Sequence, residues 1–139
     1  MNDPTIEDDT GLSEILKSAK TIAVVGASPD PGRDSHRIMK YLIGVGYDVI
    51  PVNPNYEEVL GKKCFPTLQS VDKAIDIVDV FRRSEFVDQV AQDAVSANAG
   101  VLWMQLGVIN EPAARYASDH KIKIVMNRCI MVEHRRMIR

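Results

Sequence analysis

Residues 21–45, TIAVVGASPDPGRDSHRIMKYLIGV, decide the fold, because the hydrophobic period changes once within them. Residues 21–25 are a short apolar run that ends at Gly26, as expected for a strand buried on both faces of a parallel sheet. From Ser35 onward, apolar side chains recur at helical spacing. A buried strand, a glycine loop and an amphipathic helix in this order predict the first β-α unit of an α/β domain.

The same alternation continues along the chain. Further strands are predicted at residues 48–52, 77–81, 101–104 and 123–126, and further helices at 11–19, 71–75, 85–97 and 111–120. Pro51 weakens the second strand slightly. With right-handed crossovers, this alternation predicts a Rossmann-like, doubly wound, parallel five-stranded sheet in a three-layer α/β/α architecture. The expected strand order, numbered along the chain, is 3-2-1-4-5.

The length of 139 residues favours a single domain. We expect residues 1–20 to be an N-terminal segment with a short helix, and residues 21–139 to form the domain itself. Residues 1–10 are polar and are expected to be mobile. The basic stretch at residues 127–139 is expected to be a solvated tail.

Composition argues against several classes of protein. The net charge of −2 gives no drive toward nucleic acid or an anionic membrane. No apolar run approaches the roughly 18 residues that span a bilayer, and the acidic start does not resemble a secretory signal, so a cytoplasmic location is expected. Cys64 and Cys129 lie far apart, and no spacing typical of metal ligands occurs.

In a doubly wound sheet, ligands bind beyond the carboxyl ends of the strands. The loop after the first strand is the most informative, since Gly26 allows a sharp turn and Gly32 a close approach. The N-terminus of the next helix offers free N–H groups to a phosphate, and Ser28 adds a hydroxyl. The alternative is purely structural, with Asp34 or Ser35 capping that helix.

This loop differs from the common nucleotide fingerprints. Ser28 and Pro31 stand where the dinucleotide pattern GxGxxG needs glycine, and the lysine of the ATP-binding P-loop is missing. An NAD site typically has a carboxylate after the second strand that binds the ribose, whereas this chain has Asn53 there. A neutral amide would not repel a phosphorylated ribose, so coenzyme A (CoA) fits better than NAD, and NADP fits equally well on charge alone.

Two further groups of residues follow the later strands. Arg82 and Arg83 come directly after the third strand, where guanidinium groups suit phosphate oxygens. The alternative is that both are solvated or paired with Glu85 or Asp79. Other positive side chains that could add to this edge are Arg33, His36, Arg37 and Arg128. Gln105 and Gly107 follow the fourth strand, whereas Trp103 is expected in the core.

Five stretches together resemble the CoA-binding domain family, small free-standing relatives of the CoA-binding domain of succinyl-CoA synthetase alpha subunits. The stretches are VVGASPDPGRDSHRIMKYL (24–42), PVNPNYEEVLGKK (51–63), DIVDVFRRSEFV (76–87), LWMQLGVINEPAA (102–114) and NRCIMVEHRR (127–136). Each stretch alone is a weak signal, but their ordered combination is specific.

The resemblance implies a Rossmann-like fold with CoA across the sheet edge. It places Gly26, Ala27, Ser28 and Pro29 at the pyrophosphate, Asn53, Pro54 and Tyr56 in the second loop, Phe81 and Arg82 after the third strand, and Gln105 and Gly107 on the far side. In the larger synthetases a separate domain supplies a phosphorylated histidine. This chain ends before such a domain, and none of its histidines lies in a matching context, so ligase activity is not expected.

We therefore predict a CoA or acyl-CoA binding protein without a complete catalytic site, acting as a carrier or metabolic sensor. The alternative is an enzyme that uses NADP or an acyl-CoA. Cys129 is the one candidate nucleophile, and a mixed disulfide with the CoA thiol is a variant of this idea, whereas the alternative is a buried structural cysteine. A homodimer and an unidentified protein partner both stay open.

Overall fold

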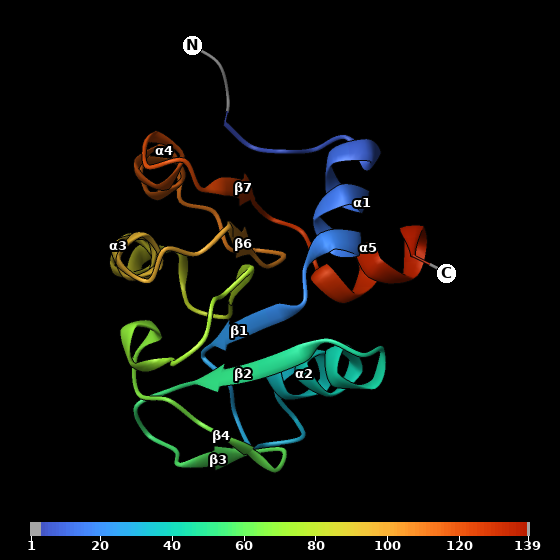
Figure 1. Cartoon of the computed structure of the whole chain (residues 1–139), viewed down its shortest axis with the longest axis vertical. Helices are drawn as coiled ribbons and strands as arrows, with labels where there is room; N and C mark the ends of the chain where they lie inside the picture. Colours follow the sequence, from blue (N-terminus) through green and yellow to red (C-terminus); the bar gives the residue numbers. More distant parts are fainter. Residues whose placement is uncertain (1–3, 139) are drawn as a thin grey trace.

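The structure is a computed structural model that describes residues 4–138. Its centre is a parallel five-stranded sheet, as predicted (Figure 1). The strands are β1 (Thr21–Val25), β2 (Asp48–Val52), β5 (Ile77–Val80), β6 (Val101–Met104) and β7 (Lys123–Val125). A short antiparallel hairpin of β3 (Glu58–Val59) and β4 (Lys62–Lys63) lies beside β2.

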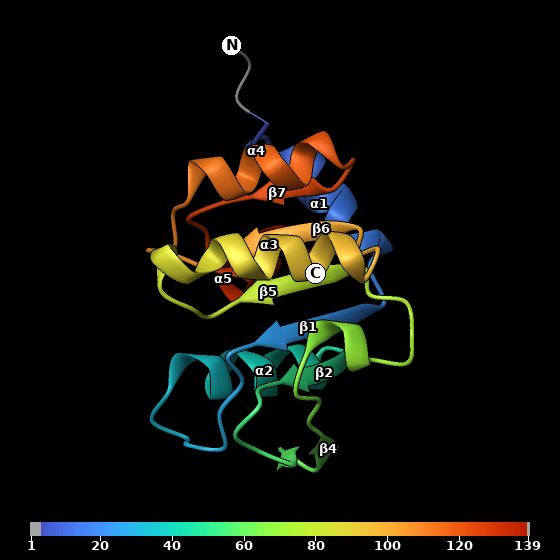
Figure 2. The same ribbon diagram turned by 90° about the vertical axis from the view of Figure 1, so that its left-hand side faces the viewer.

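Helices cover both faces of the sheet, so the three-layer architecture is confirmed (Figures 1 and 2). One face carries α1 (Asp9–Ser18), α2 (Asp34–Gly44) and α5 (Ile130–Met137), and the other carries α3 (Val87–Ser96) and α4 (Glu111–Asp119). Alternate side chains of each strand enter the two cores, because successive residues of a strand point to opposite faces. Ile22 and Val24 pack with α1, α2 and α5, while Ala23 and Val25 pack with α3 and α4.

The predicted strand order is wrong at one strand. The order is β2-β1-β5-β6-β7, which is 2-1-3-4-5 along the chain, because the third strand pairs with β1 and not with β2. β2 is therefore an edge strand. The Pro51 carbonyl accepts a hydrogen bond from the Phe65 N–H on the side away from β1, so the side of Pro51 that lacks an N–H faces this edge. A proline at that position cannot donate to a further strand.

The connection from β2 to β5 contains no α-helix. The helix predicted at residues 71–75 is absent, and a single 3₁₀ turn, η1 (Leu68–Ser70), precedes that stretch. Thr67 begins η1 with a reciprocal capping box, in which its side chain accepts from the Ser70 N–H. This short turn replaces a crossover helix and lets the chain pass to the far side of β1.

Both ends of the described chain are packed. Residues 1–3 lie outside the described part, but Thr5 pairs with Ile124 beside β7, so residues 5–6 are held at the sheet edge. The basic stretch at the C-terminal end is not a solvated tail, since it forms α5 with Ile130 and Met131 buried. Two sequence expectations are corrected here, because burial of apolar side chains outweighs the local polar composition.

Candidate functional site

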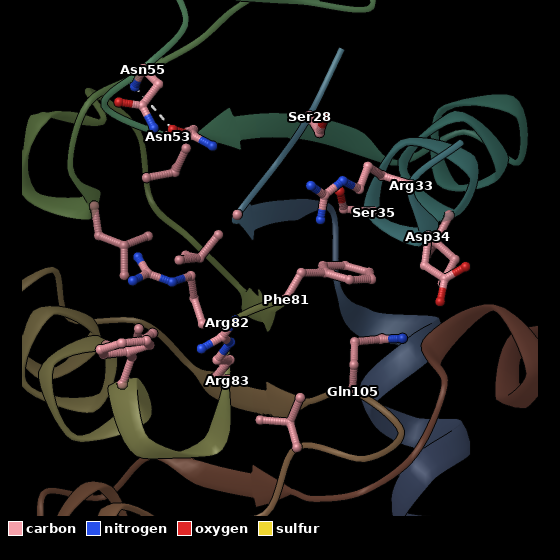
Figure 3. Close-up of a pocket in the computed structure, with 18 of the residues that line it drawn as sticks. Ser28, Arg33, Asp34, Ser35, Asn53, Asn55, Phe81, Arg82, Arg83 and Gln105 are labelled. Atoms are coloured by element: carbon pink, nitrogen blue, oxygen red, sulfur yellow. Dashed lines mark hydrogen bonds between the residues drawn. The ribbon is translucent and has the colours of Figure 1, made fainter. Parts of the chain in front are cut away.

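The observed strand order places the switch point between β1 and β5. These strands are neighbours, yet β1 continues into α2 on one face and β5 into η2 (Ser84–Phe86) and α3 on the other. A crevice opens where such connections diverge. A cleft of about 1570 Å³ lies there, larger than the roughly 300–1,000 Å³ of ordinary small-ligand pockets (Figure 3).

Gly26 lines this crevice. Its φ is +91°, a conformation that favours glycine, and a Cβ built on it would lie 2.5 Å from the carbonyl oxygen of Phe81. The two loops that follow β1 and β5 can therefore approach each other only because residue 26 lacks a side chain. The sequence-based interpretation of Gly26 as a sharp turn agrees with this geometry.

The loop after β1 is braced by its own hydrogen bonds. Ser28 Oγ accepts from the Asp30 N–H at 3.1 Å, and Asp30 Oδ1 accepts from the Gly32 N–H at 2.9 Å. Ser28 therefore keeps its O–H free to donate. The α2 helix then begins after Arg33 with no side-chain cap, so neither Asp34 nor Ser35 blocks its N-terminus. Uncapped N–H groups at a helix start favour an anion.

Asn53 holds the first and second loops together. Its Nδ2 donates to the Ala27 carbonyl at 2.9 Å, and its Oδ1 accepts from the Asn55 N–H at 2.9 Å. The side chain lies at the cleft wall, where an NAD site would carry a carboxylate (Figure 3). Asn53 thus positions the loops around the cleft in addition to keeping that wall neutral.

Three exposed arginines surround the cleft. Arg33, Arg82 and Arg83 all line it, and among residues 4–138 none of them forms an ion pair. The predicted alternative partner Asp79 is fully buried, and Arg82 lies over the ring of Phe86 with its Cζ atom 5.0 Å from the ring centroid. The three guanidinium groups are available to an anionic ligand.

The cleft gathers most of the predicted site residues. Those that line it are Gly26, Ser28, Arg33, Asn53, Pro54, Tyr56, Phe81, Arg82, Arg83 and Gln105. Three others do not line it. Ala27 is buried, Pro29 is exposed outside the lining, and Gly107 donates its N–H to Asn127 Oδ1. Contact of any of these residues with a ligand stays a prediction.

Several lining residues were not predicted. Thr67 and Leu68 come from the η1 turn, while Met131 and Val132 come from α5. The α5 segment was missed because it was expected to be a solvated tail, and Thr67 and Leu68 were missed because they do not directly follow a predicted strand. Cys129, the candidate nucleophile, also lines the cleft beside Met131.

The other predicted positive side chains have structural roles. Arg128 pairs with Glu133 at 2.9 Å and donates to the Glu7 carbonyl. Arg37 pairs with Asp34 at 2.9 Å, and His36 Nδ1 lies 3.0 Å from the Ser28 carbonyl oxygen. Only Arg37 of these three lines the cleft.

Within the described residues, no three His, Cys, Asp or Glu side chains gather as a set that could hold a metal ion. No helix of that part combines the length and apolar character needed to cross a bilayer.

The fold and the cleft define a Rossmann-like α/β protein with a crevice at its switch point. Comparison with known proteins assigns the family. The family described as CoA binding domain matches residues 20–135. This chain belongs to that family.

Relatives fall into two groups. Uncharacterized protein YneT of Bacillus subtilis (strain 168) is 43% identical over 123 residues, which cover 88% of this chain and 91% of the relative. A hypothetical protein from Pyrococcus horikoshii OT3 has a solved structure with a TM-score of 0.93 and 43% identity, covering 96% of this chain and 94% of that one.

The relatives in the second group are much longer proteins. Acetate–CoA ligase (ADP-forming) I of Archaeoglobus fulgidus is 32% identical over 80 residues, which are 58% of this chain but 12% of the ligase. The chain thus spans a small part of the ligase that it matches.

Proposed function

We propose that the chain binds CoA or an acyl-CoA in the β1–β5 crevice and acts by recognition, with no catalytic constellation of its own. The observation that carries this proposal is the uncapped α2 N-terminus beside Gly26, surrounded by three arginines that form no ion pairs within the described chain. CoA carries a pyrophosphate and a 3′-phosphate, which match N–H groups and guanidinium forks. Membership of the CoA binding domain family supports the same ligand.

A carrier or sensor role is part of this proposal. The likeness to acetate–CoA ligases covers 12% of the length of one such ligase, so the ligase reaction is not transferred to this chain. A cytoplasmic location is part of the proposal, because the free thiols of Cys64 and Cys129 suit a reducing compartment.

Calorimetric titration of the purified protein with CoA, dephospho-CoA and NADP tests the proposal. We expect CoA to bind, dephospho-CoA to bind more weakly, and NADP to bind weakest. CoA should also raise the melting temperature by mass action. Binding of NADP without binding of CoA would overturn the proposal in favour of a nicotinamide enzyme.

Two arginine variants locate the binding. Arg33→Ala and Arg82→Ala should each weaken CoA binding about ten- to a hundredfold, since each removes a charge-assisted hydrogen bond worth about 1.5–3 kcal/mol. Arg115→Ala is the matched control, because Arg115 is exposed on α4 and does not line the cleft. Equal losses in all three variants would contradict a site at the crevice.

A further inference from the structure

Some segments that line the cleft carry charged side chains and others do not, and the uncharged lining from the loop after β6 and the start of α5 is called the uncharged end below. The charged lining residues come from the loop after β1, the start of α2, and the segment from Arg82 through α3. The lining residues contributed by the loop after β6 and by the start of α5 carry no charge. These residues are Gln105, Leu106, Val108, Cys129, Met131 and Val132.

Apolar side chains are exposed at this uncharged end. Leu106 is 69% exposed and Val132 is 52% exposed, the two highest values among the exposed large hydrophobic side chains of the described chain. Both line the cleft. Exposed apolar side chains on the wall of a cleft favour an apolar ligand group, because covering them removes their surface from water.

Hydrogen bonds within the protein hold the uncharged end in place. Gln105 is 5% exposed, and its Oε1 accepts from the Ile130 N–H at 3.1 Å, so the loop after β6 is joined to the start of α5. The Arg128 N–H donates to the Met104 carbonyl, and the Gly107 N–H donates to Asn127 Oδ1 at 2.8 Å. Hydrogen bonds on both sides of Leu106 therefore fix this wall before any ligand arrives.

We propose that the uncharged end of the cleft holds the aliphatic acyl group of a short-chain acyl-CoA. This inference rests on the proposed function, which places the phosphates of CoA at the charged end. The thioester is the uncharged end of the same molecule. Figure 3 shows Phe81 between Arg33 and Gln105, so a thioester end that leaves phosphates at the α2 N-terminus would pass Phe81 to reach Gln105, which Leu106 follows in the lining.

Acyl-CoA thioesters of increasing acyl-chain length test whether the acyl group contacts this end of the cleft. Each methylene that becomes buried contributes up to about 0.8 kcal/mol, or about fourfold in affinity. We expect affinity to rise from acetyl-CoA through butyryl-CoA to hexanoyl-CoA, by at least tenfold over the series.

The experiment titrates the whole chain calorimetrically with CoA and these three thioesters. The variants are Leu106→Gln, Val132→Gln and the control Val45→Gln. Val45 is 43% exposed at the end of α2 and does not line the cleft. Relative to its own affinity for free CoA, each of Leu106→Gln and Val132→Gln should lose most of the gain in affinity with chain length, whereas Val45→Gln should keep that gain.

The outcomes separate the two proposals. Binding of CoA with the same affinity for all three thioesters would overturn the acyl site and leave CoA binding in place. A chain-length effect that survives in Leu106→Gln and Val132→Gln would overturn its location at this end of the cleft. No binding of CoA or any thioester would overturn the proposed function, and this inference with it.

Discussion

Single residues decide how close the loops of the crevice can come. The φ of Gly26 is +91°, and the Phe81 carbonyl occupies the place of its missing Cβ. Gly46 has a similar φ of +104°, but a Cβ there would meet no atom within 4 Å. The two glycines therefore separate the cost of backbone strain from the cost of a steric clash.

This comparison predicts unequal costs for two alanine substitutions. Gly46→Ala should destabilise the fold by about 1–2 kcal/mol, the strain of a left-handed alanine. Gly26→Ala should cost about 1–3 kcal/mol more, because the added methyl group must displace the Phe81 backbone. Urea unfolding of both variants measures the difference. Equal free energies of unfolding would contradict the close approach of the two loops.

Asp79 is a second residue with an unusual position. It lies in the middle of β5 between Val24 and Trp103 on the neighbouring strands, is 0% exposed, and neither carboxyl oxygen has a hydrogen-bond partner within the described residues. Burial raises the pKa of this carboxyl well above its usual range. The folded chain therefore holds a proton on Asp79 that the unfolded chain releases above about pH 4.

The sign of this effect is fixed by proton linkage. Because the folded pKa is raised, stability from Asp79 is complete below about pH 4 and is lost as the pH rises toward the folded pKa. Relative to Asp79→Asn, the parent chain should lose up to about 1.4 kcal/mol per pH unit over that range. Thermal or urea unfolding from pH 4 to pH 8 measures both proteins. Parallel pH curves would show that Asp79 is charged in the folded chain.

At the scale of elements, ion pairs join the two terminal helices. Glu133 of α5 is 7% exposed and accepts from both Arg128 and Arg136, and Arg136 also pairs with Asp9 of α1 at 2.7 Å. The arginine beside Asp9 lowers the pKa of that carboxyl. This network fixes α5, whose first residues form the uncharged wall of the cleft.

Removing the central carboxylate should therefore loosen α5. We expect Glu133→Gln to cost about 1–3 kcal/mol, since two arginines lose a mostly buried partner. Lys73→Gln is the control, because the Lys73–Asp48 pair is exposed on both sides and should contribute about 0–1 kcal/mol. Chemical unfolding compares them, and a larger loss in Lys73→Gln would contradict a stabilising role for the network.

The contact between α2 and α5 adds a dependence on pH. His134 is 7% exposed, with its Nδ1 atom 2.7 Å from the Tyr41 hydroxyl, and burial lowers its pKa. The Tyr41 and Tyr47 rings both pack edge-on against His134, and Arg135 lies over the Tyr41 ring.

Protonation of this histidine should weaken the fold. With a lowered folded pKa, the stability from neutral His134 is present above about pH 6.5 and is lost as the pH falls below that value. His134→Gln should remove this part of the acid sensitivity. The parent chain should exceed His134→Gln in free energy of unfolding by more at pH 7.5 than at pH 5.5, and a difference that is the same at both pH values would refute the assignment.

At the scale of the whole molecule, the sequence predicts the positions of the strands better than their order in the sheet. The five strands were predicted within one residue of their observed bounds, because buried parallel strands are continuous apolar runs. The strand order depends on whether the strand after β2 pairs with β2 or with β1. No local pattern in residues 53–76 indicates which of the two pairings forms. Pro51 was the available signal, since it marks β2 as an edge strand and excludes the order in which β2 is internal.

The wrong order also changed the predicted centre of the site. With the third strand beside β1, the Phe81–Arg82 loop faces Gly26 directly, whereas the predicted order would have placed the loop after β6 there. The polar half of the cleft was still predictable, because its residues directly follow strand ends. The part of the cleft that α5 forms was not predictable, because the basic residues of this segment suggested a solvated tail and not a packed helix.

The central claim is that CoA binds in the crevice between β1 and β5. The most direct test is a titration with CoA followed by backbone amide NMR, in which glycine signals report different parts of the fold. We predict large shifts for Gly26 and Gly32 at the crevice and none for Gly46 and Gly61, which do not line it. Shifts at Gly46 or Gly61 with none at Gly26 and Gly32, or no shift anywhere at millimolar CoA, would contradict this account.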